Sequence, residues 1–148
     1  MSQLSFGRNL PESVIGVGVD IIRTARFEDI ALRAPGGVAA RLFTANELAD
    51  RRANDCEYLA SRFAAKEAVM KSLGCGMGDM SFEDIEVYHL ESGAPAVRLS
   101  GVASRRARQA GAVRVLVSVS HDRDYVCAFA VALGSAGGGG ADDETCDS

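Results

Sequence analysis

The fold is decided by one stretch of the chain, Arg62-Phe-Ala-Ala-Lys-Glu-Ala-Val-Met-Lys-Ser-Leu-Gly-Cys-Gly-Met-Gly78. Its alanines, and the absence of glycine and proline before Gly74, favour a helix over Leu59–Leu73. Gly74 can then end the helix, because glycine readily adopts the left-handed conformation found at helix C-termini. We therefore expect one long helix in the middle of the chain, followed by a glycine-rich loop.

This helix carries the only two lysines of the chain, Lys66 and Lys71, which lie on either side of Glu67. At about 100° per residue, Glu67 and Lys71 share a face with Ala60 and Ala64. Two interpretations are open. The pair is either an ordinary helix ion pair worth roughly 0.3 kcal/mol, or an acid and an ammonium group presented to a bulky ligand on a floor of methyl groups.

Composition indicates a single soluble globular domain of 148 residues, with 47% hydrophobic and 24% charged residues. The net charge of −4 is misleading, because the C-terminal tail holds four of the 20 acidic residues and no basic residue. The rest of the chain is close to neutral, so we expect no nucleic-acid partner. No apolar run reaches about 18 residues, so we expect no membrane span either.

Cysteine and histidine usage argues against a zinc site, because these residues are scattered and form no CxxC pair. They are Cys56, Cys75, Cys127, Cys146, His89 and His121. Free thiols suit a reducing compartment, and the N-terminus lacks a charged-then-apolar signal. We therefore expect a cytoplasmic protein.

A strand is predicted over Val14–Ile22, which is short and rich in β-branched residues and therefore reads as buried. Gly16 and Gly18 indicate a bend or a close backbone approach. Asp20 is out of place in such a strand, because burying a lone carboxylate is costly. It is either hydrogen bonded to the start of the next helix or a functional group, and the sequence leaves both open.

Helices are predicted between this strand and the long helix. Thr24 would cap a helix over Ala25–Arg33, with Phe27 on its inner stripe. Thr44-Ala-Asn-Glu47 fits a capping box at the start of a second helical region. Asp55 is a candidate cap for the long helix.

The second half of the chain alternates strand and turn signals. The predicted elements are strands over Ile85–Leu90 and Ala96–Leu99, a helix over Gly101–Gly111, and strands over Val113–His121 and Tyr125–Leu133. The last two form an antiparallel hairpin with His121 at its tip and Val113, Val115, Val117 and Val119 on one face. The fold class is α+β, with an antiparallel sheet packed with a long central helix and shorter helices. One domain spans residues 14–133, between a flexible extension over 1–13 and a disordered acidic tail over 134–148.

Three segments, Gly16–Ile21, Arg62–Ala68 and Val117–His121, occur in this order and with the expected separations. Together they resemble the holo-[acyl-carrier-protein] synthases, the small type of 4'-phosphopantetheinyl transferase. The Arg62–Ala68 block is the most specific of them. Supporting matches are Phe43–Leu48, Gly74–Gly78 and Ser81–Val87, so the resemblance covers about residues 15–133.

The resemblance implies that the chain transfers the 4'-phosphopantetheine arm of coenzyme A to a serine of an apo acyl carrier protein and releases adenosine 3',5'-bisphosphate. It also implies Mg²⁺ as a cofactor and a homotrimer whose active sites are shared between subunits. Asp20 and Glu67 match the two metal-binding carboxylates, Lys71 and His121 match residues that lie against coenzyme A, and Arg26 matches an arginine that meets the carrier protein. We therefore expect catalysis from Asp20, Glu67 and Lys71. We expect coenzyme A to be bound by Arg62, Lys71, Gly74 and His121, and the carrier protein by Arg23 and Arg26.

This chemistry needs such residues, because the oxygens of a diphosphate repel an attacking nucleophile. Mg²⁺ usually takes one or two carboxylates together with phosphates and waters, a role that Asp20 and Glu67 would fill. Lys71 could neutralise charge on the phosphates and the leaving group. The nucleophile is the carrier's serine, and its base is a water on the metal, Glu67 or another carboxylate. Carrier proteins are acidic, so Arg23 and Arg26 would steer them.

Two positions depart from the family pattern. Ala94 stands where relatives often have lysine, and Asp122 where a threonine or small residue is common. Two other functions remain open from the sequence: a Mg²⁺-dependent hydrolase of nucleotide pyrophosphates, and a non-catalytic oligomeric scaffold. The sequence does not say which carrier protein is served.

Overall fold

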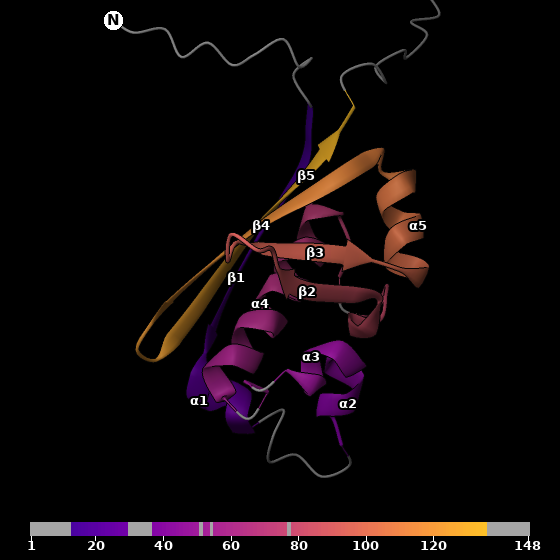
Figure 1. The fold of residues 1–148 in the computed structure, drawn as a ribbon. Helices are drawn as coiled ribbons and strands as arrows, with labels where there is room; N and C mark the ends of the chain where they lie inside the picture. The colour runs from indigo at the N-terminus through magenta and orange to yellow at the C-terminus, as the bar shows by residue number, and fades with distance from the viewer. Residues whose placement is uncertain (1–12, 30–36, 51, 54, 77, 136–148) are drawn as a thin grey trace, which may run out of the picture.

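A computed structural model describes residues 13–29, 37–50, 52–53, 55–76 and 78–135, and its elements form the expected α+β fold (Figure 1). The first half contains β1 (Ser13–Arg23), α1 (Thr24–Phe27), α2 (Ala39–Leu42), α3 (Ala45–Ala49) and α4 (Cys56–Ser72). The second half contains η2 (Phe82–Asp84), β2 (Ile85–His89), β3 (Pro95–Leu99), α5 (Gly101–Gln109), β4 (Ala112–Asp122) and β5 (Tyr125–Gly134). The predicted N-terminal extension and acidic tail fall almost entirely outside the described residues.

The strands form two antiparallel sheets, a three-stranded sheet in the order β1-β5-β4 and a two-stranded sheet of β2 and β3. The first strand of the domain therefore pairs with the last. In Figure 1, α4 runs alongside the three-stranded sheet, with the β2–β3 hairpin on another side of the helix. Within the described residues, no helix is both long and apolar enough to span a membrane.

The long central helix was predicted correctly and is extended at its N-terminus. Asp55 caps it, since its side chain accepts a hydrogen bond of 2.9 Å from the backbone N–H of Glu57. Gly74 follows its last turn with φ of 71°, the left-handed conformation expected there. Much of the helix surface is buried, and four fully buried alanines face the surrounding elements: Ala60, Ala64, Ala65 and Ala68.

The glycines of β1 allow the strand to lie directly on α4. A Cβ atom on Gly16 would overlap the carbonyl oxygen of Ser72, and one on Gly18 would overlap the carbonyl oxygen of Ala68. The close approach predicted from these glycines is therefore confirmed. It fixes the position of α4 along β1 over two successive turns of the helix.

Two sequence predictions about local structure were wrong. The first strand is not a buried strand: Val19 and Ile21 are 55% and 66% exposed, because β1 is an edge strand with one face turned away from α4. Thr24 does not cap the next helix, whose N-cap is Arg23 without a side-chain cap bond. A register shift lies between Ala112 and Arg114, and Val113 beside it is 63% exposed. Residues 30–33 of the predicted Ala25–Arg33 helix lie outside the described residues.

Candidate functional site

A groove of about 870 Å³ lies between β1 and α4 and contains several of the predicted site residues. We call it the β1 groove. Its lining consists of Asp20, Ile21, Ile22, Arg23, Arg26, Val38, Leu42, Phe63, Glu67, Phe82 and Tyr125. Apolar side chains form most of this lining, and the carboxylates of Asp20 and Glu67 are partly shielded from water.

Asp20 of β1 and Glu67 of α4 both line this groove, and Lys71, one turn beyond Glu67 on α4, reaches Asp20. The Lys71 ammonium donates to the Val19 carbonyl over 2.8 Å and to the Asp20 carboxylate over 3.1 Å. Lys71 therefore forms its ion pair with Asp20 and not with its helix neighbour Glu67, and the side chain is 47% exposed. The Asp20 side chain is thus bonded to Lys71 and not to the start of the next helix, which was one of the two interpretations left open by the sequence.

One oxygen of the Glu67 carboxylate lacks a hydrogen-bond partner. Its Oε1 atom is buried and has no hydrogen-bond partner. Burial raises the pKa of Glu67, the charge of Asp20 raises it further, and Lys71 partly opposes both. Such a carboxylate gains from a nearby cation, because a buried acceptor without a partner is costly.

These observations fit a Mg²⁺ ion held by Asp20 and Glu67. Mg²⁺ binds through one or two carboxylates and takes its remaining oxygens from phosphates and water. Among the described residues no three His, Cys, Asp or Glu side chains cluster as a metal cage. The pair therefore suits an ion shared with a phosphate-bearing ligand better than an ion enclosed by protein.

The rim of the β1 groove is basic. Arg23 and Arg26 are both exposed there, and the Arg23 guanidinium donates to the Tyr125 hydroxyl over 2.7 Å. Tyr125 was missed by the sequence reasoning. Its proximity follows from the β1–β5 register, which pairs Arg23 with Tyr125, and the sequence alone does not give that register.

The wall opposite β1 is held together by aromatic rings and by a buried ion pair. Phe63 stacks on Phe82 with ring centroids 5.3 Å apart. Lys66 is fully buried, and its ammonium donates to Glu47 Oε2 over 2.6 Å and to the carbonyls of Leu42 and Phe82 over 2.8 and 3.1 Å. One lysine thus ties α4 to α2, α3 and η2, and the predicted capping box around Glu47 is confirmed.

Arg62 and His121, both predicted to bind coenzyme A, lie elsewhere. They line a second hollow of about 300 Å³, which we call the Arg62 hollow. Its other lining residues are Arg52, Asp55, Glu57, Tyr58, Ser61, Val87, His89, Gly93, Pro95 and Val119. His121 Nδ1 lies 3.3 Å from Glu57 Oε1 at the start of α4.

Helix geometry explains the separation. Arg62 precedes Glu67 and Lys71 by five and nine positions, which places it about 140° and about 180° around α4 from them. One chain therefore presents its predicted site residues in two groups, on different sides of one helix. Gly74 lies just beyond Lys71, and its N–H donates to the Lys71 carbonyl over 3.0 Å.

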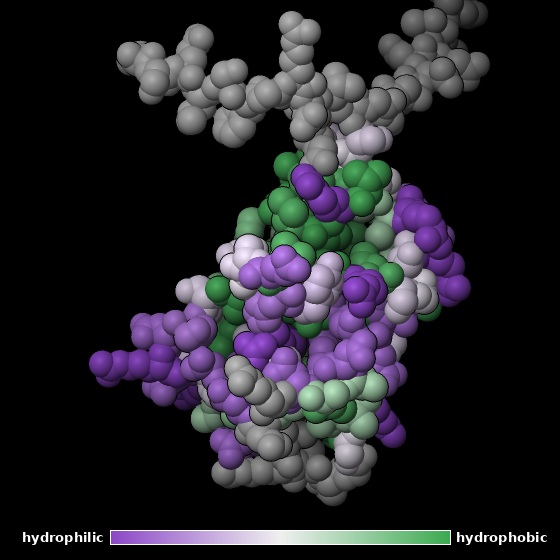
Figure 2. All heavy atoms as spheres, viewed as in Figure 1, coloured by the Kyte–Doolittle hydropathy of each residue, from purple (hydrophilic) through white to green (hydrophobic). Residues whose placement is uncertain are grey.

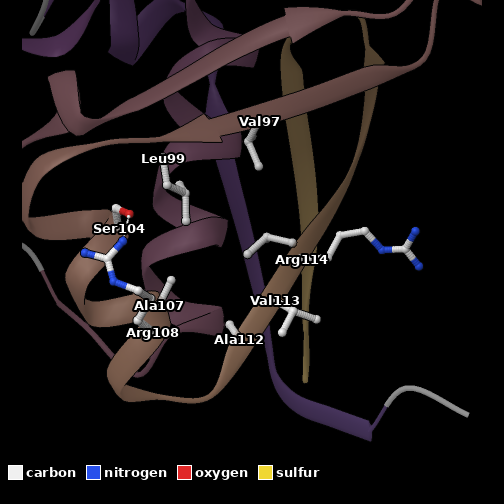
Figure 3. A pocket seen from close by; sticks show the side chains of 9 residues that line it. Val97, Leu99, Ser104, Ala107, Arg108, Ala112, Val113 and Arg114 are labelled. Atoms are coloured by element: carbon white, nitrogen blue, oxygen red, sulfur yellow. Dashed lines mark hydrogen bonds between the residues drawn. The ribbon is translucent and has the colours of Figure 1, made fainter. Parts of the chain in front are cut away.

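A third hollow, of about 350 Å³, lies between α5, β3 and β4 (Figure 3). Val97 and Leu99 line it from β3, Ser104 and Arg108 border it from α5, and the Arg114 side chain points away from it in Figure 3. None of the site residues predicted from the sequence lies in this lining. The two groups described above are therefore the candidate site.

Comparisons with known proteins agree on one family. The family model described as the 4'-phosphopantetheinyl transferase superfamily matches residues 16–130. A holo-[acyl-carrier-protein] synthase from Desulforudis audaxviator is 41% identical over 123 residues, covering 82% of this chain and 94% of that protein. Among solved structures, an acyl carrier protein synthase from Plasmodium yoelii with ADP bound has a TM-score of 0.77 and 30% identity, covering 84% and 98% of the two chains. A holo-[acyl-carrier-protein] synthase from Helicobacter pylori in complex with coenzyme A has a TM-score of 0.69 and 28% identity, covering 78% and 98%.

Proposed function

This chain belongs to the 4'-phosphopantetheinyl transferase superfamily, and from its relatives we infer that it is a holo-[acyl-carrier-protein] synthase. The substrate is coenzyme A, and the acceptor is a serine of an apo acyl carrier protein. The products are the holo carrier protein and adenosine 3',5'-bisphosphate. The observation in this chain that best supports the assignment is the pair of carboxylates, Asp20 and Glu67, in the β1 groove, with the Lys71 ammonium bonded to Asp20.

We propose that Asp20 and Glu67 hold Mg²⁺ beside the diphosphate of coenzyme A. When Mg²⁺ is bound, the negative charge that repels an incoming hydroxyl is reduced. The orphaned Oε1 of Glu67 and the charge repulsion between Glu67 and Asp20 support this role. Both carboxylates are carried by elements whose relative position is fixed by Gly16 and Gly18, so the pair is preorganised.

Lys71 is placed to act on the phosphates. It is half-exposed and is held beside Asp20 by one carboxylate and one carbonyl contact, which leaves one of its three N–H donors for a ligand. A point charge there stabilises the negative charge that develops on adenosine 3',5'-bisphosphate as it leaves. The apolar lining contributed by Phe63 and Phe82 limits access of water, which favours transfer over hydrolysis.

We propose that the acyl carrier protein docks on the rim of the β1 groove. Arg23 and Arg26 are exposed there, next to the carboxylate pair. An acidic partner that contacts both guanidinium groups would bring a serine close to Asp20 and Glu67. The hydrogen bond from the Arg23 guanidinium to the Tyr125 hydroxyl holds the Arg23 charge in one position.

We further propose a homotrimer in which two subunits complete each active site. The separation of Arg62 and His121 from Lys71 supports it, because the two groups line different hollows on different sides of α4 and neighbouring subunits could bring them together. The outer face of the three-stranded sheet also supports it, since it exposes large apolar side chains without cover: Val17, Val19, Ile21, Leu116 and Phe129. Figure 2 shows other apolar residues over the upper part of the molecule, beside hydrophilic residues on α5.

The three described cysteines are free thiols, which suits the cytoplasmic location that we propose.

Intact-mass analysis tests the reaction directly. Incubation with coenzyme A, Mg²⁺ and several apo carrier proteins should add the mass of the phosphopantetheine arm to a carrier. Cleavage of coenzyme A without a carrier, and without this mass gain, would instead identify a hydrolase. The carrier that reacts fastest would also identify the natural partner.

Subunit mixing tests the shared site. Arg62→Ala and Lys71→Ala should each be inactive alone, because each removes one half of every site. After the two variants are mixed and allowed to exchange subunits, about a quarter of the sites should regain both intact halves. A mixture as inactive as its components, with exchange verified by mass spectrometry, would exclude sharing between subunits.

A further inference from the structure

Arg62 is a buried charge without a carboxylate partner. It is 5% exposed, and no described carboxylate makes an ion pair with it. Its guanidinium stacks on the Tyr58 ring at 3.9 Å from the centroid, and its Nε atom is buried without a hydrogen-bond partner. A buried guanidinium in this condition is expected to receive an anion, because an uncompensated buried charge is costly.

Two side chains fix the orientation of this guanidinium. Nη1 donates to the Ser61 hydroxyl over 3.2 Å, and Nη2 lies 3.0 Å from His89 Nδ1. Arginine carries only donors, so His89 Nδ1 must accept this bond, and the imidazole must be neutral with its proton on Nε2. The His89 residue as a whole is exposed, but its Nδ1 faces Arg62. Desolvation there and the charges of Arg62 and Arg52 lower the pKa of His89, which keeps it neutral.

We propose that His89 is a positioning residue that holds the Arg62 guanidinium in the orientation that receives a phosphate of coenzyme A. The inference rests on the proposed function, which gives the anion its identity. His89 is the last residue of β2 and pairs with Pro95 across the hairpin. The β2–β3 hairpin thereby helps to shape a binding site whose charge is carried by α4.

A positioning role predicts a specific pattern of variants. His89→Ala removes the acceptor and should weaken equilibrium binding of coenzyme A about fivefold, the scale of one partly exposed hydrogen bond to a charged group. KM for coenzyme A should rise by a similar factor while kcat stays within about twofold, since the hydrogen bond serves ground-state and transition-state binding alike. His89→Asn places Oδ1 where Nδ1 was and should restore most of the affinity.

The experiment is a double-mutant cycle read by isothermal titration calorimetry with coenzyme A. Its variants are His89→Ala, Arg62→Met, which keeps an apolar stem, and their combination. In the Arg62→Met background, His89→Ala should change the affinity by less than twofold, because its effect passes through Arg62. Glu91→Ala, an exposed position on the same hairpin, is the matched control and should bind coenzyme A as the wild type does.

Each other outcome overturns the inference. Unchanged affinity in His89→Ala, beside weakened affinity in Arg62→Met, would show that Arg62 needs no positioning and would leave the proposed function intact. An equal loss with and without Arg62 would show that His89 acts independently of it. A loss that His89→Asn does not restore, with all melting temperatures equal, would exclude the acceptor role. A wild-type chain that binds no coenzyme A in the calorimeter would overturn this inference and the proposed function together.

Discussion

Replacing Lys66 by methionine should destabilise the protein far more than the same change at Lys71. Both lysines lie on α4, yet one is buried and the other is partly exposed. Lys66 is fully buried and bonded to Glu47 and two carbonyls, whereas the Lys71 side chain is 47% exposed. Burial lowers the pKa of Lys66, and the charge of Glu47 opposes that shift, so the pair depends on both partners.

The magnitude follows from what Lys66→Met leaves behind. Glu47 is 2% exposed, and it would keep only neutral donors, including the Val87 N–H at 2.9 Å. Breaking a buried ion pair in this way costs about 3–5 kcal/mol. For a domain of this size, that corresponds to a fall in Tm of roughly 6–20 °C. Lys71→Met loses a partly exposed pair and should cost less than about 1 kcal/mol.

Urea denaturation followed by circular dichroism measures these differences, with the wild type and Lys71→Met as references. A combined Lys66→Met and Glu47→Gln variant removes the buried charge, and its amide oxygen can still accept from Val87. It should recover part of the loss and end about 1–2 kcal/mol below the wild type. A loss below about 1 kcal/mol for Lys66→Met, or a double variant less stable than the single one, would refute the reasoning.

Three further predictions follow from other parts of the site. Gly18→Ala should lower the free energy of unfolding by about 3 kcal/mol in urea titrations, because its new Cβ collides with the backbone of α4. Glu67→Gln should abolish arm transfer in the mass assay without lowering the Mg²⁺-free Tm; Mg²⁺ should raise the Tm of the wild type only. Folding raises the pKa of Glu67, so its carboxyl group holds a proton more tightly in the folded state than in the unfolded state. The contribution of Glu67 to wild-type stability should therefore fall as the pH rises from the ordinary glutamate pKa through the raised one. Glu67→Gln has no group that titrates there and should lack that fall. Arg26→Glu should raise KM for the carrier protein several-fold and leave KM for coenzyme A unchanged in steady-state kinetics; equal changes in both would exclude Arg26 from carrier docking.

Local patterns in the sequence were enough to predict the framework of the site. Helix propensity and Gly74 gave α4, and the spacing of Thr44 and Glu47 gave the capping box. The pairing of β4 with β5 and that of β2 with β3 followed from alternation and turn residues. These features depend on interactions between residues close in sequence, which propensities and periodicity describe well.

Contacts between distant segments were not predictable in the same way. Periodicity placed Glu67 and Lys71 on one face of α4, but it could not show that Asp20 would attract the lysine. It could not reveal that β1 would be an edge strand, so its β-branched residues read as buried although one face is exposed. Thr24 fits the composition of a cap, yet its hydroxyl is buried without a partner, because the chain enters α1 with Arg23 at the cap position.

The two groups of candidate residues make α4 the element on which both halves of the site depend. Lys71 and Glu67 project from one side of the helix and Arg62 from another, so a shift of α4 along its axis would displace both groups together. Two contacts oppose such a shift: the glycines of β1 leave no room between strand and helix, and Lys66 ties the helix to the wall of the β1 groove. If neighbouring subunits supply complementary groups, the position of one helix in each subunit sets the geometry of two active sites.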